Sequence, residues 1–157
     1  MDLAAWLERL EQLHPSAIDL GLARCGEVAR RLDLVDTAVT TITVAGTNGK
    51  GSTVAVMEAI LCARGDCVGA FTSPHLVRYN ERIRVDGAEV SDALIVEAFE
   101  AIEKARSDIS LTYFEFNTLA ALWIFKKLDV AFQLQVAFAL FVEEPDAIGP
   151  ISGVIAH

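Results

Sequence analysis

The stretch TTITVAGTNGKGST, which occupies Thr40–Thr53, decides the fold class of this chain. An apolar, β-branched run gives way abruptly at Gly46 to a glycine-rich segment, and a helical pattern follows. This order predicts a strand, a tight turn and a helix. In such a turn, backbone N–H groups and the positive end of the helix dipole point at one place, and Lys50 adds a mobile positive charge there. The stretch therefore predicts a phosphate site.

The turn is a variant of the common phosphate loop G-x-x-x-x-G-K-[ST]. Val44 stands where the first glycine should be, and Gly51 separates Lys50 from the hydroxyl residue Ser52. The strand before the turn, the helix after it and the Lys-x-Ser spacing favour a nucleoside triphosphate as ligand. Lys50 would contact the phosphates as a point charge, and Ser52 would offer its hydroxyl to Mg²⁺. A glycine-rich turn without a ligand is the alternative interpretation.

The residues after this loop predict a parallel sheet with helices. Apolar spacing continues the helix to Arg64, Gly65 can adopt the left-handed cap, and residues 67–71 form a second strand. A strand, a helix and a strand within about 30 residues indicate a βαβ unit with parallel strands. Ligands of such sheets bind at the carboxyl ends of the strands. The loop at 46–52 and the segment at 72–75 should therefore meet at one edge of the sheet.

The rest of the pattern predicts further helices and one unusual strand. Helices are expected over 3–13, to about residue 32 after Leu22, from Ser91 to about 106, and over 111–127. The segment 72–87 is expected to be a long surface loop with a short extended piece, and its arginines either form a solvated face or serve a ligand. From Val130 to Val142 the apolar side chains alternate, which predicts a strand that is kinked or frayed because of its length.

Composition restricts the function classes. The chain has 157 residues, enough for one domain with a real core, and 53% of them are hydrophobic. A formal net charge of −9 argues against nucleic acid as a partner. The N-terminus lacks a secretory signal, and no run approaches the roughly 18 apolar residues of a membrane span, so we expect a cytoplasmic protein without membrane partners. Three cysteines without metal-ligand spacing predict reduced thiols.

Four segments of the chain together resemble the bacterial dihydrofolate synthase/folylpolyglutamate synthases, a branch of the Mur ligase superfamily. The resemblance extends from about Trp6 to Val130. It implies a fold of the α/β class, a truncated Mur ligase central ATPase domain with a mostly parallel, phosphate-loop-containing sheet flanked by helices. The segments are Ile18–Leu22 (IDLGL), Val44–Ser52 (VAGTNGKGS), Ser73–Arg82 (SPHLVRYNER) and Leu111–Phe116 (LTYFEF).

The resemblance also implies a reaction and its ligands. The reaction is ATP-dependent amide formation with Mg²⁺, in which a carboxylate of dihydropteroate or a folate is phosphorylated and the amine of L-glutamate attacks the acyl phosphate. A monomer is expected. The implied site residues are Thr47, Asn48, Gly49, Lys50, Gly51 and Ser52 for ATP, with Lys50 catalytic; Ser52 and Ser73 for metal; and Asp19, Leu20, Gly21, Leu22, Thr112, Tyr113, Phe114 and Glu115 for the pterin.

Two of these residues have simpler interpretations from the sequence alone. Asp19 could be a helix cap, and Glu115 could be a first-turn carboxylate that interacts favourably with a helix dipole. The resemblance moves both of them to ligand contacts. His75, Arg78 and Arg82 fall in the segment that the resemblance places beside the folate, and their roles are not apportioned.

The resemblance stops abruptly after Val130. The family continues with a metal-binding glutamate, a glycine-rich motif, a His-Asp pair, a carbamylated lysine and a C-terminal domain that binds glutamate, and this sequence shows none of them. We therefore expect a partial ATP-binding domain over 1–130 and a divergent tail over 131–157 that adds a strand. Such a break predicts a frameshift, a rearrangement or a truncated gene product.

Three functional hypotheses stay open at this stage. The chain is the folate-type ligase, a catalytically inactive remnant that binds nucleotide or pterin, or an unrelated phosphate-loop NTPase that acts as a switch or chaperone. Phosphate release that needs both dihydropteroate and glutamate would favour the first. ATP binding without turnover would favour the second, and hydrolysis without a pterin would favour the third.

Overall fold

The computed structural model describes residues 1–12, 22–35, 38–136 and 151–156. The helices are α1 (Leu3–Gln12), α2 (Leu22–Arg31), α3 (Lys50–Arg64), α4 (Asp92–Arg106) and α5 (Tyr113–Lys127), with a 3₁₀ turn η1 (Tyr79–Arg82). The strands are β1 (Thr40–Ala45), β2 (Val68–Phe71), β3 (Ile83–Val85), β4 (Ala88–Glu89), β5 (Phe132–Val136) and β6 (Ile151–Ala156).

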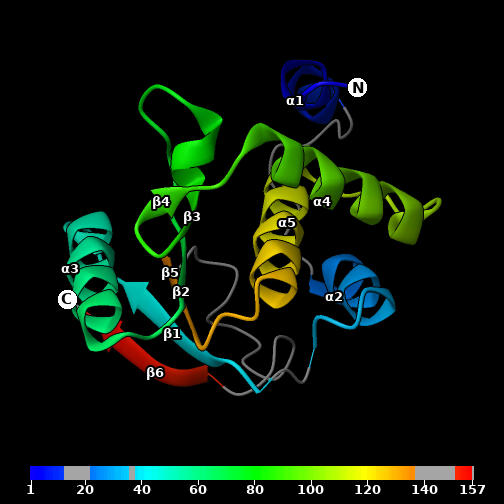
Figure 1. The fold of residues 1–157 in the computed structure, drawn as a ribbon. Helices are drawn as coiled ribbons and strands as arrows, with labels where there is room; N and C mark the ends of the chain where they lie inside the picture. Colours follow the sequence, from blue (N-terminus) through cyan, green and yellow to red (C-terminus); the bar gives the residue numbers. More distant parts are fainter. Residues whose placement is uncertain (13–21, 36–37, 137–150, 157) are drawn as a thin grey trace.

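The strands form one six-stranded sheet in the order β4-β3-β2-β5-β1-β6 (Figure 1). β2, β5, β1 and β6 are parallel, and β3 and β4 form an antiparallel edge. The predicted βαβ unit is confirmed, but its two strands are not neighbours, because β5 lies between them and pairs with both. The fold is thus of the predicted α/β class with a mostly parallel sheet.

Helices cover both faces of this sheet (Figure 1). α3 packs on one face, where Val44, Val54 and Leu134 form part of a small apolar cluster. α5 covers the other face, and α1, α2 and α4 pack around it in the larger core. Trp6, Phe99 and Phe116 are in ring contact in that core, so the predicted apolar stripe of the first helix is buried.

β5 confirms the predicted alternation of side chains in the divergent segment. Its apolar side chains Phe132, Leu134 and Val136 belong to the cluster under α3. On the opposite face, the side-chain amides of Gln133 and Gln135 donate hydrogen bonds to Thr41 and Thr43, their register partners on β1. The strand is therefore matched to β1 on both faces. Residues 137–142, the rest of the predicted strand, lie outside the described residues.

One expectation was wrong in part. The segment 72–87 is not only a loop with an extended piece, because η1 and the β3–β4 hairpin begin within it. The hairpin turns at Asp86 and Gly87, both with positive φ (51° and 77°). Gly87 tolerates that conformation without strain, which allows the chain to reverse and pair its edge with β2.

Candidate functional site

The predicted phosphate loop joins β1 to α3. Gly49, with φ 75°, is the N-cap of α3, so the helix begins at Lys50. A helix start leaves its first backbone N–H groups without partners inside the helix, and the dipole makes the place electropositive. Thr47, Asn48, Gly49, Gly51 and Ser52 are all exposed around this point. The geometry is that of an anion site.

The side chain of Lys50 is held in place by the backbone of the phosphate loop. Its ammonium donates a hydrogen bond of 2.6 Å to the carbonyl oxygen of Gly46. An ammonium has three N–H donors, so two remain for phosphate oxygens. The hydroxyl of Thr53 donates to the carbonyl of Gly49, 3.0 Å away, which ties the first turn of α3 to the loop.

Ser73 lies at the same edge of the sheet as the phosphate loop. β1 and β2 are both parallel to β5, so Gly46 and Thr72 leave the sheet at its carboxyl edge. One intervening strand separates them by roughly 10 Å. The Ser73 hydroxyl accepts a hydrogen bond of 2.9 Å from Nη1 of Arg82. The predicted metal residues thus lie at one edge of the sheet, Ser52 in the first turn of α3 and Ser73 on the loop after β2.

The start of α5 completes this edge. The Thr112 hydroxyl accepts from the backbone N–H of Glu115, and Glu115 Oε2 accepts from the backbone N–H of Thr112 at 2.7 Å. This reciprocal pair is a capping box. Both oxygens of the Glu115 carboxylate also lie 3.4 Å from Nη2 of Arg24. The simpler interpretation of Glu115, a first-turn carboxylate, is therefore present in the structure, and a pterin contact remains a proposal.

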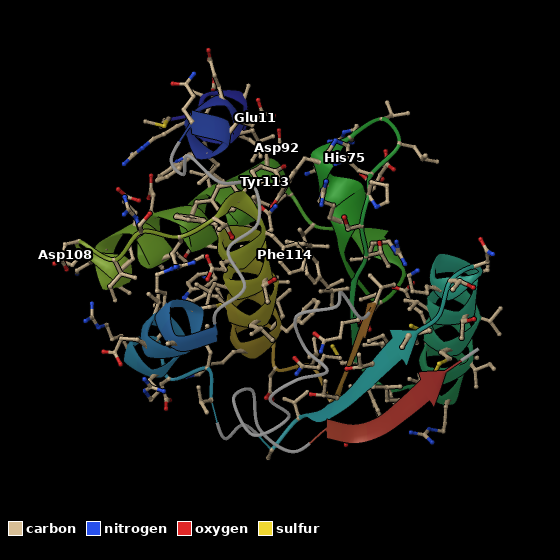
Figure 2. All side chains as sticks on the ribbon, turned by 180° about the vertical axis from the view of Figure 1, so that it is seen from behind. Glu11, His75, Asp92, Asp108, Tyr113 and Phe114 are labelled. Atoms are coloured by element: carbon tan, nitrogen blue, oxygen red, sulfur yellow. The ribbon has the colours of Figure 1, made fainter. Side chains whose placement is uncertain are left out.

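The two aromatic residues of this segment face the loop after β2. Tyr113 lies under the Arg82 guanidinium, 5.7 Å from ring centroid to Cζ, and Phe114 contacts Phe71 at the end of β2. Figure 2 shows Tyr113 and Phe114 at the beginning of α5 and His75 on the neighbouring segment. Of the other predicted pterin residues, Leu22 is the first residue of α2, and Asp19, Leu20 and Gly21 lie outside the described residues.

Sequence reasoning left the residues that organise the loop after β2 without assigned roles. The Glu81 carboxylate accepts hydrogen bonds of 2.6–2.7 Å from the backbone N–H groups of Leu76, Val77 and Arg78. Arg82 is only 9% exposed, so it does not belong to a solvated face, whereas the side chain of Arg78 is 61% exposed. The sequence signal was the density of charged residues in this segment, which does not say which of them turn inward.

The Glu81 contacts predict a local pH response. The backbone N–H groups of Arg78, Leu76 and Val77 lower the pKa of Glu81 from 4.5 to about 2. A lowered folded-state pKa contributes stability above pH 4.5 that is lost as the pH falls toward 2. The protection of the amides of residues 76–78 against hydrogen exchange, relative to their intrinsic rates at each pH, should therefore fall across that window. In Glu81→Gln this protection should already be low at neutral pH and should not change with the carboxylate titration; an unchanged protection profile in this variant would contradict the assignment.

The described residues offer a magnesium ion hydroxyls but no anionic cage. Among them, no three histidine, cysteine, aspartate or glutamate side chains gather into a metal site. Mg²⁺ at nucleotide sites usually keeps several waters and takes phosphate oxygens as ligands. The exposed hydroxyl of Ser52 at the start of α3 fits one such position. The described residues thus fit Mg²⁺ only as part of a metal–nucleotide complex.

Comparisons with known proteins agree with this geometry. No family model matches the chain. The dihydrofolate synthase/folylpolyglutamate synthase of Escherichia coli is 55% identical over 130 residues, which are 82% of this chain and 31% of that protein. The enzyme of the same name from Haemophilus influenzae is 49% identical over 130 residues, 82% of this chain and 30% of its own length. The matched part of this chain belongs to the dihydrofolate synthase/folylpolyglutamate synthase family.

Solved structures show that the fold of this family extends over the same part. The Escherichia coli enzyme in complex with DHPP and ADP superposes with a TM-score of 0.85 at 49% identity, covering 88% of this chain and 33% of that one. The Yersinia pestis enzyme, complexed with AMPPNP and a manganese ion, gives 0.84 at 50% identity, with 88% and 34% covered. The fold is of the Mur ligase type, as the resemblance implied. The chain spans about a third of the length of the relatives that it matches.

Proposed function

We propose that this chain carries the nucleotide-binding and pterin-binding part of an ATP-dependent ligase that joins L-glutamate to dihydropteroate and to folates. One observation supports the proposal most. The phosphate loop with Lys50, the Ser73 segment and the start of α5 meet at the carboxyl edge of a parallel sheet, where ligands of such sheets bind.

The proposed reaction makes use of each group at this edge. A substrate carboxylate attacks the terminal phosphate of ATP, forming an acyl phosphate and releasing ADP. The glutamate amine then displaces phosphate. Thr47, Asn48 and Gly49 would bind phosphate oxygens through the loop, and Lys50 would neutralise charge on the transferred group. Mg²⁺, held with the nucleotide near Ser52 and Ser73, would supply charge neutralisation. Asp19 to Leu22 and Thr112 to Glu115 would contact the pterin.

The division of the chain is part of the proposal. We assign residues 1–130 to a partial ATP-binding domain of the Mur ligase type and residues 131–157 to a tail that completes the sheet. Support comes from β5, which lies in the centre of the sheet and pairs with β1 and β2.

Among the described residues, no helix is both long and apolar enough to cross a membrane. We propose a cytoplasmic monomer that acts on small molecules and not on nucleic acid.

Binding without ligation is the second candidate function. One observation favours it, namely that the described residues do not gather a set of metal-binding carboxylates at the phosphate loop. We therefore expect the isolated 157-residue chain to bind nucleotide with little or no ligation. A glutamate-dependent release of phosphate that also requires dihydropteroate, and that Lys50→Ala removes, would favour the ligase. Hydrolysis without a pterin would favour an unrelated NTPase.

Lys50→Ala tests the phosphate site itself. Loss of a charged hydrogen-bonding partner should weaken binding of AMPPNP with Mg²⁺ by roughly 10- to 100-fold, since such contacts contribute about 1.5–3 kcal/mol. Isothermal titration calorimetry measures this directly. Lys104→Ala, on the exposed side of α4, is the matched control and should bind like the unaltered chain. Equal affinities of the two variants would contradict the assignment of Lys50.

A further inference from the structure

Arg82 is a buried cation at the carboxyl edge of the sheet. It ends η1, and its carbonyl oxygen accepts a hydrogen bond of 2.9 Å from the backbone N–H of Thr72, the residue that follows β2. Its relative exposure is 9%. The backbone pairing therefore fixes the base of the Arg82 side chain beside Ser73, at the edge where the phosphate loop also lies.

Among the described residues, the guanidinium of Arg82 contacts only uncharged groups. Nε donates to Nδ1 of His75 at 2.7 Å, and Nη1 donates to the hydroxyl of Ser73 at 2.9 Å. The rings of Tyr79 and Tyr113 lie 5.8 and 5.7 Å from Cζ. In the described part of the chain no carboxylate forms an ion pair with Arg82.

The neighbouring arginines show how unusual this is. Arg84 pairs with the buried carboxylate of Glu58 at 2.8 Å, and the exposed Arg78 lies 3.5 Å from Glu89 and 3.6 Å from Asp92. Arg82 is more buried than Arg78, yet within the described part of the chain Arg78 has acidic partners and Arg82 has none. A buried charge is costly without a counter-charge. Because the described residues provide no such counter-charge, the anion of a ligand would complete the environment of Arg82.

The remaining donors match an oxyanion. A guanidinium carries five N–H groups, of which Nε and one N–H of Nη1 are used. The others lie on Nη1 and Nη2, which form the planar fork that binds carboxylate and phosphate oxygens in pairs. Because His75 accepts at Nδ1, its neutral ring carries the proton on Nε2 and offers a further donor on the same segment.

We propose that Arg82 binds an oxyanion of a ligand, with His75 and Ser73 fixing the orientation of its guanidinium. The inference rests on the proposed function for the source of that oxyanion: it is the reacting carboxylate of the acyl substrate or the terminal phosphate of the nucleotide. Both sources present paired oxygens to the same fork, and Tyr113 at the start of α5 places the fork beside the proposed pterin residues.

Side-chain NMR of the full 157-residue chain tests anion binding without any assumption about the reaction. Inorganic phosphate and benzoate are titrated while the Nε–H resonances of the arginines are followed at constant ionic strength. We expect a saturable shift for Arg82 that exceeds the shift of the exposed Arg64. An Arg82 response no larger than that of Arg64 with both probes overturns the proposal.

Calorimetry then separates the two sources. The ligands are AMPPNP and ADP, each with Mg²⁺, dihydropteroate, and a hydroxymethyl dihydropterin that lacks the carboxylate. If the oxyanion belongs to the substrate, Arg82→Gln should lower the affinity for dihydropteroate by roughly 10- to 100-fold and leave the affinity for the carboxylate-free pterin unchanged. If it belongs to the nucleotide, the variant should lower the affinity for AMPPNP more than the affinity for ADP. Equal weakening of all ligands, or of none, overturns the proposal.

Controls distinguish this result from misfolding and from failure of the proposed function. Arg64→Gln removes an exposed charge at the end of α3 that is remote from the phosphate loop, and it should leave every affinity unchanged. Arg82→Lys keeps the positive charge but lacks the planar guanidinium, so it should bind the affected ligand with intermediate affinity. If Arg82→Gln does not fold, the affinities of Arg82→Lys test the proposal instead. If the unaltered chain binds neither AMPPNP nor dihydropteroate, the proposed function fails, and the phosphate and benzoate titrations still decide whether Arg82 is an anion site.

Discussion

Arg84→Met should lower the free energy of unfolding by about 3–5 kcal/mol, the usual effect of removing one partner of a buried ion pair. Nη2 of Arg84 lies 2.8 Å from Oε2 of Glu58, and the side chains are 21% and 7% exposed. The substitution leaves the Glu58 carboxylate on α3 facing the sheet without a cation. Urea denaturation followed by circular dichroism measures the loss.

The double variant Glu58→Leu/Arg84→Met is the matched control. Replacing both charges by apolar groups removes the desolvation penalty together with the attraction, and such replacements are often neutral or stabilising. We therefore expect the double variant to recover most of the stability. Exposed ion pairs contribute at most about 1 kcal/mol. If the free energy of unfolding of Arg84→Met lies within that range of the unaltered chain, water screens this pair.

The pair also connects the candidate site to the sheet edge. Glu58 lies on α3, whose first residue is Lys50, and Arg84 lies on β3, directly after Arg82 and η1. Nη1 of Arg84 further contacts the carbonyl oxygen of Glu81 at 3.3 Å. The ion pair thus connects α3, the helix that follows the phosphate loop, to β3, the strand that begins directly after Arg82. Loss of the pair should weaken nucleotide binding as well as stability.

Gly69→Ala should destabilise the fold by about 1–3 kcal/mol, the usual effect of overpacking a core. A Cβ atom at Gly69 would lie 2.4 Å from Cδ1 of Phe125, a ring that is only 2% exposed on α5. The strand and the helix meet at this point, so the ring has to move or the helix has to lift from the sheet. Thermal unfolding measures the effect.

Two further variants make this test specific. Gly69→Ala/Phe125→Leu should recover part of the loss, because the smaller side chain makes room for the new methyl group. Gly26→Ala, in the interior of α2, meets only the flexible end of Arg30 at 3.8 Å and should raise stability by roughly 0.5–1 kcal/mol through helix propensity. A destabilisation by Gly26→Ala as large as that by Gly69→Ala would contradict the steric explanation.

Local chemistry made much of this protein predictable. The change from a β-branched strand to glycines and a lysine predicted β1, the loop and the start of α3. Gly65 ends α3 with φ 93°, and its N–H caps the carbonyls of Leu61 and Cys62 as expected. Ser91 caps α4. These features depend on residues a few positions apart, so the sequence carries them completely.

The break after Val130 shows where prediction from the sequence ended. Alternation predicted a strand in the divergent segment, and β5 occupies the centre of the sheet between β1 and β2. Its place depends on the match of Gln133 and Gln135 to Thr41 and Thr43, residues 92 positions away. A pattern of period two defines the faces of a strand but not its neighbours.

The sequence by itself determined the phosphate loop and the helix that follows it, because turn and cap chemistry is local. Only the tertiary structure decided the roles of the charges around that loop. Arg82 and Arg84 are two residues apart in the chain. Arg84 faces a buried carboxylate of α3, whereas Arg82, among the described residues, contacts only uncharged groups. The cost of a buried charge depends on the groups that long-range packing places beside it, and no local pattern contains that information.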